Sequence, residues 1–181
     1  QDALAIAGDA VFVAGTNEVT MVDVSDPAAM TAGTPFLTGD MGGNWMIDVE
    51  GTRLVGVTGS TIAVVDITDP SAPGAPSLLS VTNLQPGGID LLGGELYVGT
   101  YSTTYGFAAF DCSSGTPVFD DGVVQPGHYF ESVAVDLGGT AHVLTDDYGL
   151  ATFDVSDPAD ISYLDADYIQ AGGDMTDVAL D

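Results

Sequence analysis

A repeat of about 43 residues constrains this chain more than any other feature. Four similar heptapeptides, MVDVSDP (21–27), VVDITDP (64–70), AFDCSSG (109–115) and TFDVSDP (152–158), have central aspartates spaced by 43, 45 and 43 residues. A second marker keeps the same register, because a Gly-X dipeptide lies between short apolar runs at residues 8, 51, 93 and 138. Two independent markers in one register predict a repeated structural unit.

Each repeat carries several short apolar runs rather than a helical pattern. In the first repeat these runs cover residues 3–7, 11–14 and 19–24, with a weaker run near 36–37. The Gly-X dipeptides suit two-residue hairpins of type II′, in which glycine takes a positive φ. Four strands in each period of roughly 40 to 45 residues are typical of a β-propeller blade. We therefore predict an all-β propeller with four-stranded blades at about 2–40, 45–84, 88–125 and 131–170.

The heptapeptides also resemble a known repeat. The phrase V-V-D-[VI]-[ST]-D-P is similar to the LVIVD repeat, with three good copies and a degenerate copy at 109–115, where Cys112 and Gly115 replace an aliphatic residue and proline. The resemblance implies a propeller of a secreted or surface-attached microbial protein, and it implies no shared reaction.

The end of the sequence matches the beginning of a blade. Residues 178–180 align with Val133 to Val135 at a spacing of 45, so 175–181 are predicted to start a further blade. We expect these residues to be an excerpt of a six- or seven-bladed propeller, with further blades of the same parent chain as packing partners.

The repeated aspartates invite two interpretations. Asp23 and Asp26, with their equivalents, could be paired carboxylates for calcium or acid–base chemistry. A catalytic pair occurs once per active site, whereas these residues recur in each repeat, and a short acid before proline suits a turn. We predict structural turn roles for Asp23, Asp26, Asp66, Asp69, Asp111, Asp154 and Asp157.

The remaining loops differ from repeat to repeat, which favours a binding surface. In a propeller blade, the inter-blade loops and the loops between the second and third strands share one face. The candidate ligand residues on this face are Asn44, Trp45, Tyr101, Tyr105, His128, Tyr129, Glu131 and Asp174. Alternatively, Trp45, Tyr129 and Phe130 pack between blades or fill the mouth of the channel.

The net charge limits the classes of partner that this chain can bind. The chain has 27 acids and a single base, Arg53, for a net charge of −26, which disfavours nucleic acids and anionic membranes. A partner of the acidic face should be cationic, sugar-like or bridged by a metal. One cysteine, Cys112, and two histidines, His128 and His142, exclude an internal disulfide and leave few ligands for transition metals.

Two functions remain open at this point. We favour a non-enzymatic interaction propeller, extracellular or at the cell surface, that binds a protein or carbohydrate without a cofactor. The alternative is a calcium-dependent hydrolase in which acids such as Glu131 or Asp174 hold a metal on the channel axis. No nucleophile-elbow, zincin, P-loop or dinucleotide-binding motif is present in the sequence.

The charge generates a prediction about salt. Repulsion among 27 acids is screened more strongly as the Debye length falls from ~10 Å at 0.1 M to ~3 Å at 1 M salt. The thermal unfolding midpoint should therefore rise between about 0.05 and about 1 M NaCl. A midpoint that stayed constant or fell, followed by circular dichroism, would contradict this expectation.

Overall fold

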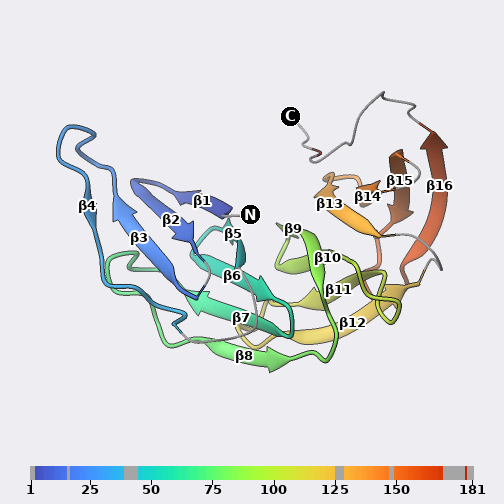
Figure 1. The fold of residues 1–181 in the computed structure, drawn as a ribbon, viewed down its shortest axis with the longest axis horizontal. Helices are drawn as coiled ribbons and strands as arrows, with labels where there is room; N and C mark the ends of the chain where they lie inside the picture. The colour runs from blue at the N-terminus through green and yellow to red at the C-terminus, as the bar shows by residue number, and fades with distance from the viewer. Residues whose placement is uncertain are drawn as a thin grey trace. The chain divides into compact units, whose positions relative to one another are not determined.

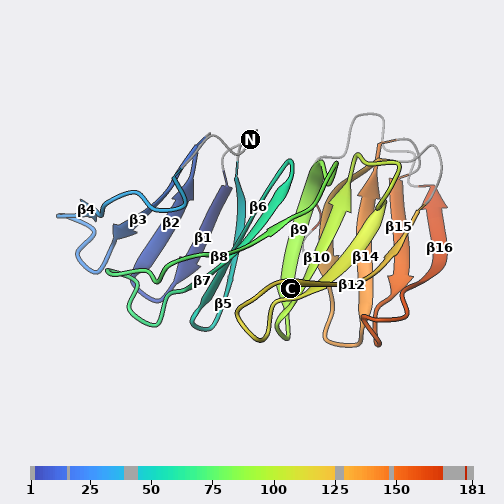
Figure 2. The ribbon, with the colours of Figure 1, turned by 90° about the horizontal axis from the view of Figure 1, so that it is seen from below.

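The structure is a computed structural model that describes residues 3–15, 17–38, 45–124, 129–146, 149–168 and 178. The described part of the chain contains sixteen strands in four four-stranded antiparallel sheets, each with its strands in chain order from one edge to the other (Figures 1 and 2). The predicted all-β class and the four strands per repeat are confirmed.

The sixteen strands have the following bounds. The first sheet contains β1 (Ala3–Ala7), β2 (Ala10–Ala14), β3 (Val19–Asp23) and β4 (Thr31–Ala32). The second contains β5 (Met46–Glu50), β6 (Arg53–Thr58), β7 (Thr61–Asp66) and β8 (Ser77–Ser80). The third contains β9 (Pro86–Leu92), β10 (Glu95–Thr100), β11 (Phe107–Asp111) and β12 (Val118–Val123). The fourth contains β13 (Phe130–Val135), β14 (Thr140–Thr145), β15 (Gly149–Asp154) and β16 (Ser162–Tyr168).

The chain divides into two compact units. Unit 1 comprises residues 1–82 and 112–117 and therefore holds the first and second sheets. Unit 2 comprises residues 83–111 and 118–181 and holds the third and fourth sheets.

The repeated aspartates occupy equivalent places, as predicted. Asp23, Asp66, Asp111 and Asp154 are the last residues of β3, β7, β11 and β15, the third strand of each sheet. In the first and second sheets, the residue after this aspartate makes a hydrogen bond to the hairpin between the first two strands. In the first sheet, the amide of Val24 donates to the Asp9 carbonyl over 2.9 Å. The same bond joins Ile67 to Thr52 over 2.8 Å in the second sheet.

Some local predictions need correction. Gly8 and Gly51 have the positive φ expected at the first position of a type II′ hairpin, but Gly93 and Gly94 are both positive, as in a type I′ turn. The fourth connection, residues 136–139, is longer than two residues. The outer strand of the first sheet is β4, and residue 36 makes only an isolated bridge to Val19.

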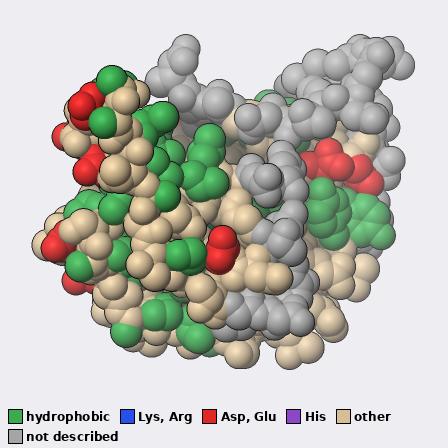
Figure 3. Space-filling view, turned by 60° about the vertical axis from the view of Figure 1, so that its left-hand side comes forward, with side chains coloured by type: hydrophobic (Ala, Val, Ile, Leu, Met, Phe, Trp, Pro, Cys, Tyr) green, Lys and Arg blue, Asp and Glu red, His purple; other side chains and the backbone are tan. Residues whose placement is uncertain are grey.

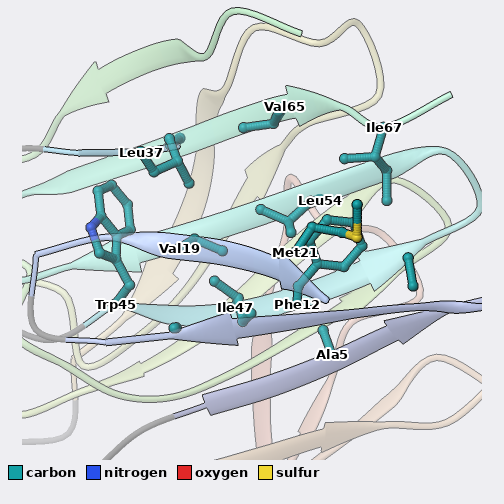
Figure 4. Packing of buried hydrophobic residues seen from close by; sticks show 13 residues of the cluster. Ala5, Phe12, Val19, Met21, Leu37, Trp45, Ile47, Leu54, Val65 and Ile67 are labelled. Carbon is teal, nitrogen blue, oxygen red and sulfur yellow. The ribbon is translucent and has the colours of Figure 1, made fainter. Parts of the chain in front are cut away.

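The core of unit 1 lies between its two sheets (Figure 4). Phe12 and Met21 project from the first sheet toward Leu54 of the second, and all three side chains are buried. Trp45, just before β5, is 1% exposed and lies beside Leu37. Its ring fits over Gly56, where an added Cβ would come within 2.9 Å of the indole. Only glycine at position 56 therefore leaves space for the Trp45 ring, the largest side chain of this core.

Unit 2 has an aromatic core of the same kind. Phe107 of the third sheet stacks on Phe153 of the fourth with ring centroids 4.6 Å apart. Phe130 meets the same ring edge-on at 5.8 Å. In both units, large side chains thus fix one sheet against its neighbour.

One face of the first sheet remains uncovered by the described residues. Leu4 and Ile6 of β1 are 67% and 69% exposed. Their equivalents one repeat later, Ile47 and Val49, pack into the core beneath the first sheet. Hydrophobic side chains accordingly lie at the surface among acidic ones on the side of β1 to β4 (Figure 3).

The buried indole generates a stability prediction. Trp45→Ala should lower the free energy of unfolding by about 3 to 5 kcal/mol, because it removes a fully buried aromatic and leaves a cavity over Gly56. Leu4→Ala is the matched control and should change it by roughly 0.5 kcal/mol or less, since that side chain is exposed. Equal effects in urea unfolding would show that the indole does not hold unit 1 together.

Candidate functional site

The aspartates at the ends of the third strands hold the turns that follow. Oδ1 of Asp66 accepts hydrogen bonds from the Thr68 amide at 2.8 Å and the Thr68 hydroxyl at 2.7 Å. Asp154 holds the amide and hydroxyl of Ser156 in the same way. Hydrogen bonds from the Thr68 and Ser156 side chains and amides lower the pKa of these carboxyls, so they stay ionised at neutral pH. Asp23 does the same with Ser25, and its pKa is also lowered.

The aspartates before proline make a second set of turn contacts. Oδ1 of Asp69 accepts bonds from the amide and hydroxyl of Ser71 at 3.0 and 2.6 Å. Asp26 and Asp157 accept the amides of Ala28 and Ala159. Each of these carboxylates uses an oxygen within its own turn, as a structural residue does.

The degenerate third turn is held differently. Gly115 takes the place of proline with a φ of 79°, and its amide donates to the Cys112 carbonyl at 3.1 Å. The guanidinium of Arg53 donates to the Ser113 carbonyl at 2.6 Å. A polar cavity of about 280 Å³ lies beside this contact, lined by Arg53, Asp66, Thr68, Ser77, Ser113 and Ser114 among others. The single base of the chain therefore fixes the turn that has lost its Asp-Pro pair.

Two tyrosines meet on the loop side of unit 2. Tyr101 follows β10, and Tyr129 immediately precedes β13, with their ring centroids 5.8 Å apart and the rings tilted by 52°. Both are open to solvent, at 39% and 44% exposure. Loops that are 28 residues apart in sequence thus form one exposed aromatic surface, here called the tyrosine pair.

Backbone contacts hold the tyrosine pair in place. The Tyr101 amide donates to the Gln85 carbonyl at 2.8 Å, and its ring lies against Gly87, where an added Cβ would be 3.1 Å from the ring edge. Tyr129 and Asp146 exchange two bonds: the Tyr129 amide donates to Asp146 Oδ1, and the Asp146 amide donates to the Tyr129 carbonyl, both at 3.1 Å.

The tyrosine pair lies in a negative field. Partial burial, followed by the charges of Glu131 and Asp146, raises the pKa of the Tyr101 hydroxyl. The phenol therefore stays neutral at physiological pH. Glu131 is half-buried on β13, and Asp146 is exposed after β14.

Seven of the eight predicted ligand residues fall into three groups. Tyr101, Tyr129 and Glu131 come together. Tyr105 is half-buried and packs edge-on against Phe119 at 6.0 Å. Asn44, His128 and Asp174 lie outside the described residues.

Trp45 must be removed from the predicted ligand surface. It is buried in the core of unit 1, which agrees with the packing alternative weighed for it. Phe130 is likewise buried, but its neighbour Tyr129 is exposed. Asp146 was not among the candidate ligand residues, although it follows the strand that pairs with β13.

Two acids, Glu95 and Asp120, lie within hydrogen-bonding distance elsewhere in unit 2. Burial raises the pKa of Glu95 to about 7, helped by a hydrogen bond to Asp120 and by the charges of Asp120 and Asp111. Burial, followed by the charges of Glu95, Asp90 and Asp120, raises the pKa of Tyr97 to about 12. A register shift between β11 and β12 at Ala109/Phe110 accompanies this arrangement.

No group of three or more His, Cys, Asp or Glu side chains is placed to hold a metal ion among the described residues. His142 pairs with Asp136 at 3.5 Å between Nε2 and Oδ2. In the part of the chain that the structure describes, no helix has the length and hydrophobicity that crossing a bilayer requires.

Comparison with protein families identifies the repeat. The family model of the LVIVD repeat matches residues 2–38 and 54–78, which cover most of the first sheet and β6 to the start of β8. These two segments of the chain are thus similar to the LVIVD repeat. The turn aspartates Asp23 and Asp66 lie inside the matched segments. No curated protein matches the sequence.

Solved structures share the fold of this chain. The WD40 domain of Pan2 from Neurospora crassa matches with a TM-score of 0.66 and 14% identity, over 97% of this chain and 55% of that one. A chain of the Mitotic Checkpoint Complex matches with a TM-score of 0.65 and 11% identity, over 92% of this chain and 51% of that one. The extracellular domain of BT4673 from B. thetaiotaomicron matches with a TM-score of 0.61 and 15% identity, over 97% of this chain and 23% of that one. The chain thus spans about half of the first two structures and less of the third.

The Glu95–Asp120 pair generates a pH prediction. Because the folded-state pKa of Glu95 is raised from 4.5 to about 7, the folded state holds this proton more tightly than the unfolded state. The stability it contributes is fully present below the unfolded pKa of 4.5 and is lost as the pH rises through about 7.

Glu95→Gln should therefore reduce the fall in unfolding free energy over this pH range. Glu18→Gln removes the same charge from an exposed position in unit 1 and serves as the control. Identical pH profiles of both variants, measured by urea unfolding, would rule out a raised pKa of Glu95 in the folded state.

Proposed function

We propose that this chain is a non-enzymatic interaction module of a secreted or cell-surface protein, and that it recognises a protein or carbohydrate partner through the loops around the tyrosine pair. The supporting observation is the contact between Tyr101 and Tyr129, two exposed rings held by backbone bonds and by Gly87. Tyrosines supply rigid contact area with a polar end, which is why they are enriched at binding interfaces.

The contrast between the two ends of the sheets supports the same proposal. The turn carboxylates at one end are occupied by local hydrogen bonds, repeated in three of the four sheets. The tyrosines come instead from loops whose length and sequence differ from those of the other repeats. A propeller in a protein complex and a propeller in an extracellular domain are among the similar folds, and both settings fit a binding role.

A further sheet is a proposed partner of the open face. Leu4 and Ile6 lie where Ile47 and Val49 are covered by the preceding sheet. We propose that a sheet from outside these 181 residues covers them in the complete protein. The similar WD40 domain, of which this chain spans 55%, is consistent with additional sheets.

The proposed function is tested in the complete protein. Tyr101→Ala combined with Tyr129→Ala should reduce capture of the partner from its native surroundings by about tenfold or more, as loss of aromatic anchors does at interfaces. Asp9→Ala combined with Thr52→Ala, both exposed at the opposite ends of the strands, should leave capture unchanged. The reverse pattern, in cross-linking and mass spectrometry of the captured material, would refute the assignment.

The same assay tests the absence of a cofactor. A chelator should leave capture unchanged if the tyrosine pair acts without a metal. Loss of capture with EDTA, restored by calcium, would favour the calcium-dependent alternative.

A further inference from the structure

Two rings and two carboxylates converge at one place in unit 2. Glu131 and Asp146 are close enough for their charges to act on the Tyr101 hydroxyl, and Asp146 is hydrogen-bonded to the Tyr129 backbone. The four residues come from the segments after β10, before β13, within β13 and after β14. All four residues lie in the part of the chain that the structure describes, and none belongs to the repeated turns.

We propose that Tyr101, Tyr129, Glu131 and Asp146 form a binding site for an arginine side chain of a partner protein. This inference rests on the proposed function, because it assigns the partner chemistry of the same loops. The faces of tyrosine rings attract cations through their quadrupole, and nearby carboxylates add charge-assisted hydrogen bonds. A guanidinium makes both interactions, because its flat face stacks on a ring while its N–H groups donate hydrogen bonds to a carboxylate.

The surroundings favour a cation over other ligands. The chain carries 27 acids against one base, and that base, Arg53, belongs to unit 1 and donates to Ser113 there. A positively charged segment is therefore drawn to the surface at long range, and an anion is repelled. Lysine would gain the same attraction but lacks the planar group that stacks on an aromatic face.

Hydrogen bonds hold the loop that carries Tyr101. The loop that carries Tyr101 is closed by bonds from the Thr100 amide to the Gly106 carbonyl at 2.9 Å and from the Ser102 amide to the Thr100 hydroxyl at 3.1 Å. Both Thr100 and Ser102 are buried. Little conformational freedom of this loop remains to be lost when a side chain stacks on the exposed face of a ring, which favours affinity.

Short peptides test the chemistry with the 181-residue chain. The probe is an acetylated, amidated Gly-Arg-Gly-Arg-Gly peptide, compared with its lysine analogue and with a citrulline analogue that keeps the planar group without the charge. By calorimetric titration at low salt, the arginine peptide should bind about two- to fivefold more tightly than the lysine peptide. Citrulline should bind more weakly than both. Equal binding of citrulline and arginine would overturn the proposal and favour a neutral, sugar-like ligand.

Matched substitutions separate the site from general attraction to an acidic protein. Asp146→Asn and Asp9→Asn each remove one negative charge, and the asparagine at 146 retains an Oδ1 acceptor for the Tyr129 amide. The proposal predicts a two- to fivefold loss of arginine-peptide affinity, or about 0.4 to 1 kcal/mol, for Asp146→Asn and none for Asp9→Asn. Equal losses would show that only the net charge matters, and the proposal would fail.

Ring-preserving variants complete the test. Tyr101→Phe with Tyr129→Phe should retain binding, because the ring faces remain, whereas Tyr101→Leu with Tyr129→Leu should abolish the preference for arginine. If the phenylalanine variant lost as much affinity as the leucine variant, hydroxyl hydrogen bonds would be responsible and the cation site would be refuted. The proposed function would still stand if partner capture depended on the tyrosines while arginine peptides bound equally to all variants.

Discussion

The packing of large apolar side chains between neighbouring sheets is the interaction on which the rest of this structure depends. In unit 1, Phe12 and Met21 of the first sheet fill the space over Leu54 of the second, and in unit 2 Phe107 stacks on Phe153. A single four-stranded sheet with two apolar faces cannot bury both faces by itself. Each repeat is therefore stable only beside another repeat, as in other repeat proteins.

Because the sheets must pack against one another, the connections at the two ends of the strands have different roles. At one end, every sheet must turn twice, and in three of the four sheets a carboxylate such as Asp66 or Asp154 accepts hydrogen bonds from the amides of the turn. At the other end, the connections are free to vary once the sheets are packed. In unit 2 this freedom brings Tyr101 and Tyr129 together beside Asp146. The resulting surface is acidic and aromatic, whereas the turns are polar and repetitive.

Much of the fold could be predicted from the sequence because its signals are local. The turn aspartates and the Gly-X hairpins recur with the repeat, and the strands end where these markers predict. The burial of Trp45 could not be read this way, since it depends on Gly56, which lies eleven residues later in a neighbouring strand. An isolated glycine within an apolar strand was the available sign of a close approach.

The candidate site was only partly predictable for the same reason. Variable loops pointed to Tyr101 and Tyr129, but the contribution of Asp146 requires the pairing of β13 with β14. The Glu95–Asp120 pair accompanies the register shift between β11 and β12, and such shifts carry no clear mark in a single sequence. Where side chains from different strands act together, spacing along the chain is not sufficient.

The most direct test of these separate roles compares two sets of substitutions in the complete protein displayed on cells. The amount of protein at the cell surface reports folding. The amount of partner bound per displayed molecule reports recognition. Substitutions of Asp23, Asp66 and Asp154 should lower display but leave partner binding per molecule unchanged. Substitutions of Tyr101, Tyr129 and Asp146 should leave display unchanged and lower binding. Loss of binding concentrated at the turn aspartates, with the tyrosines tolerant of substitution, would contradict the account.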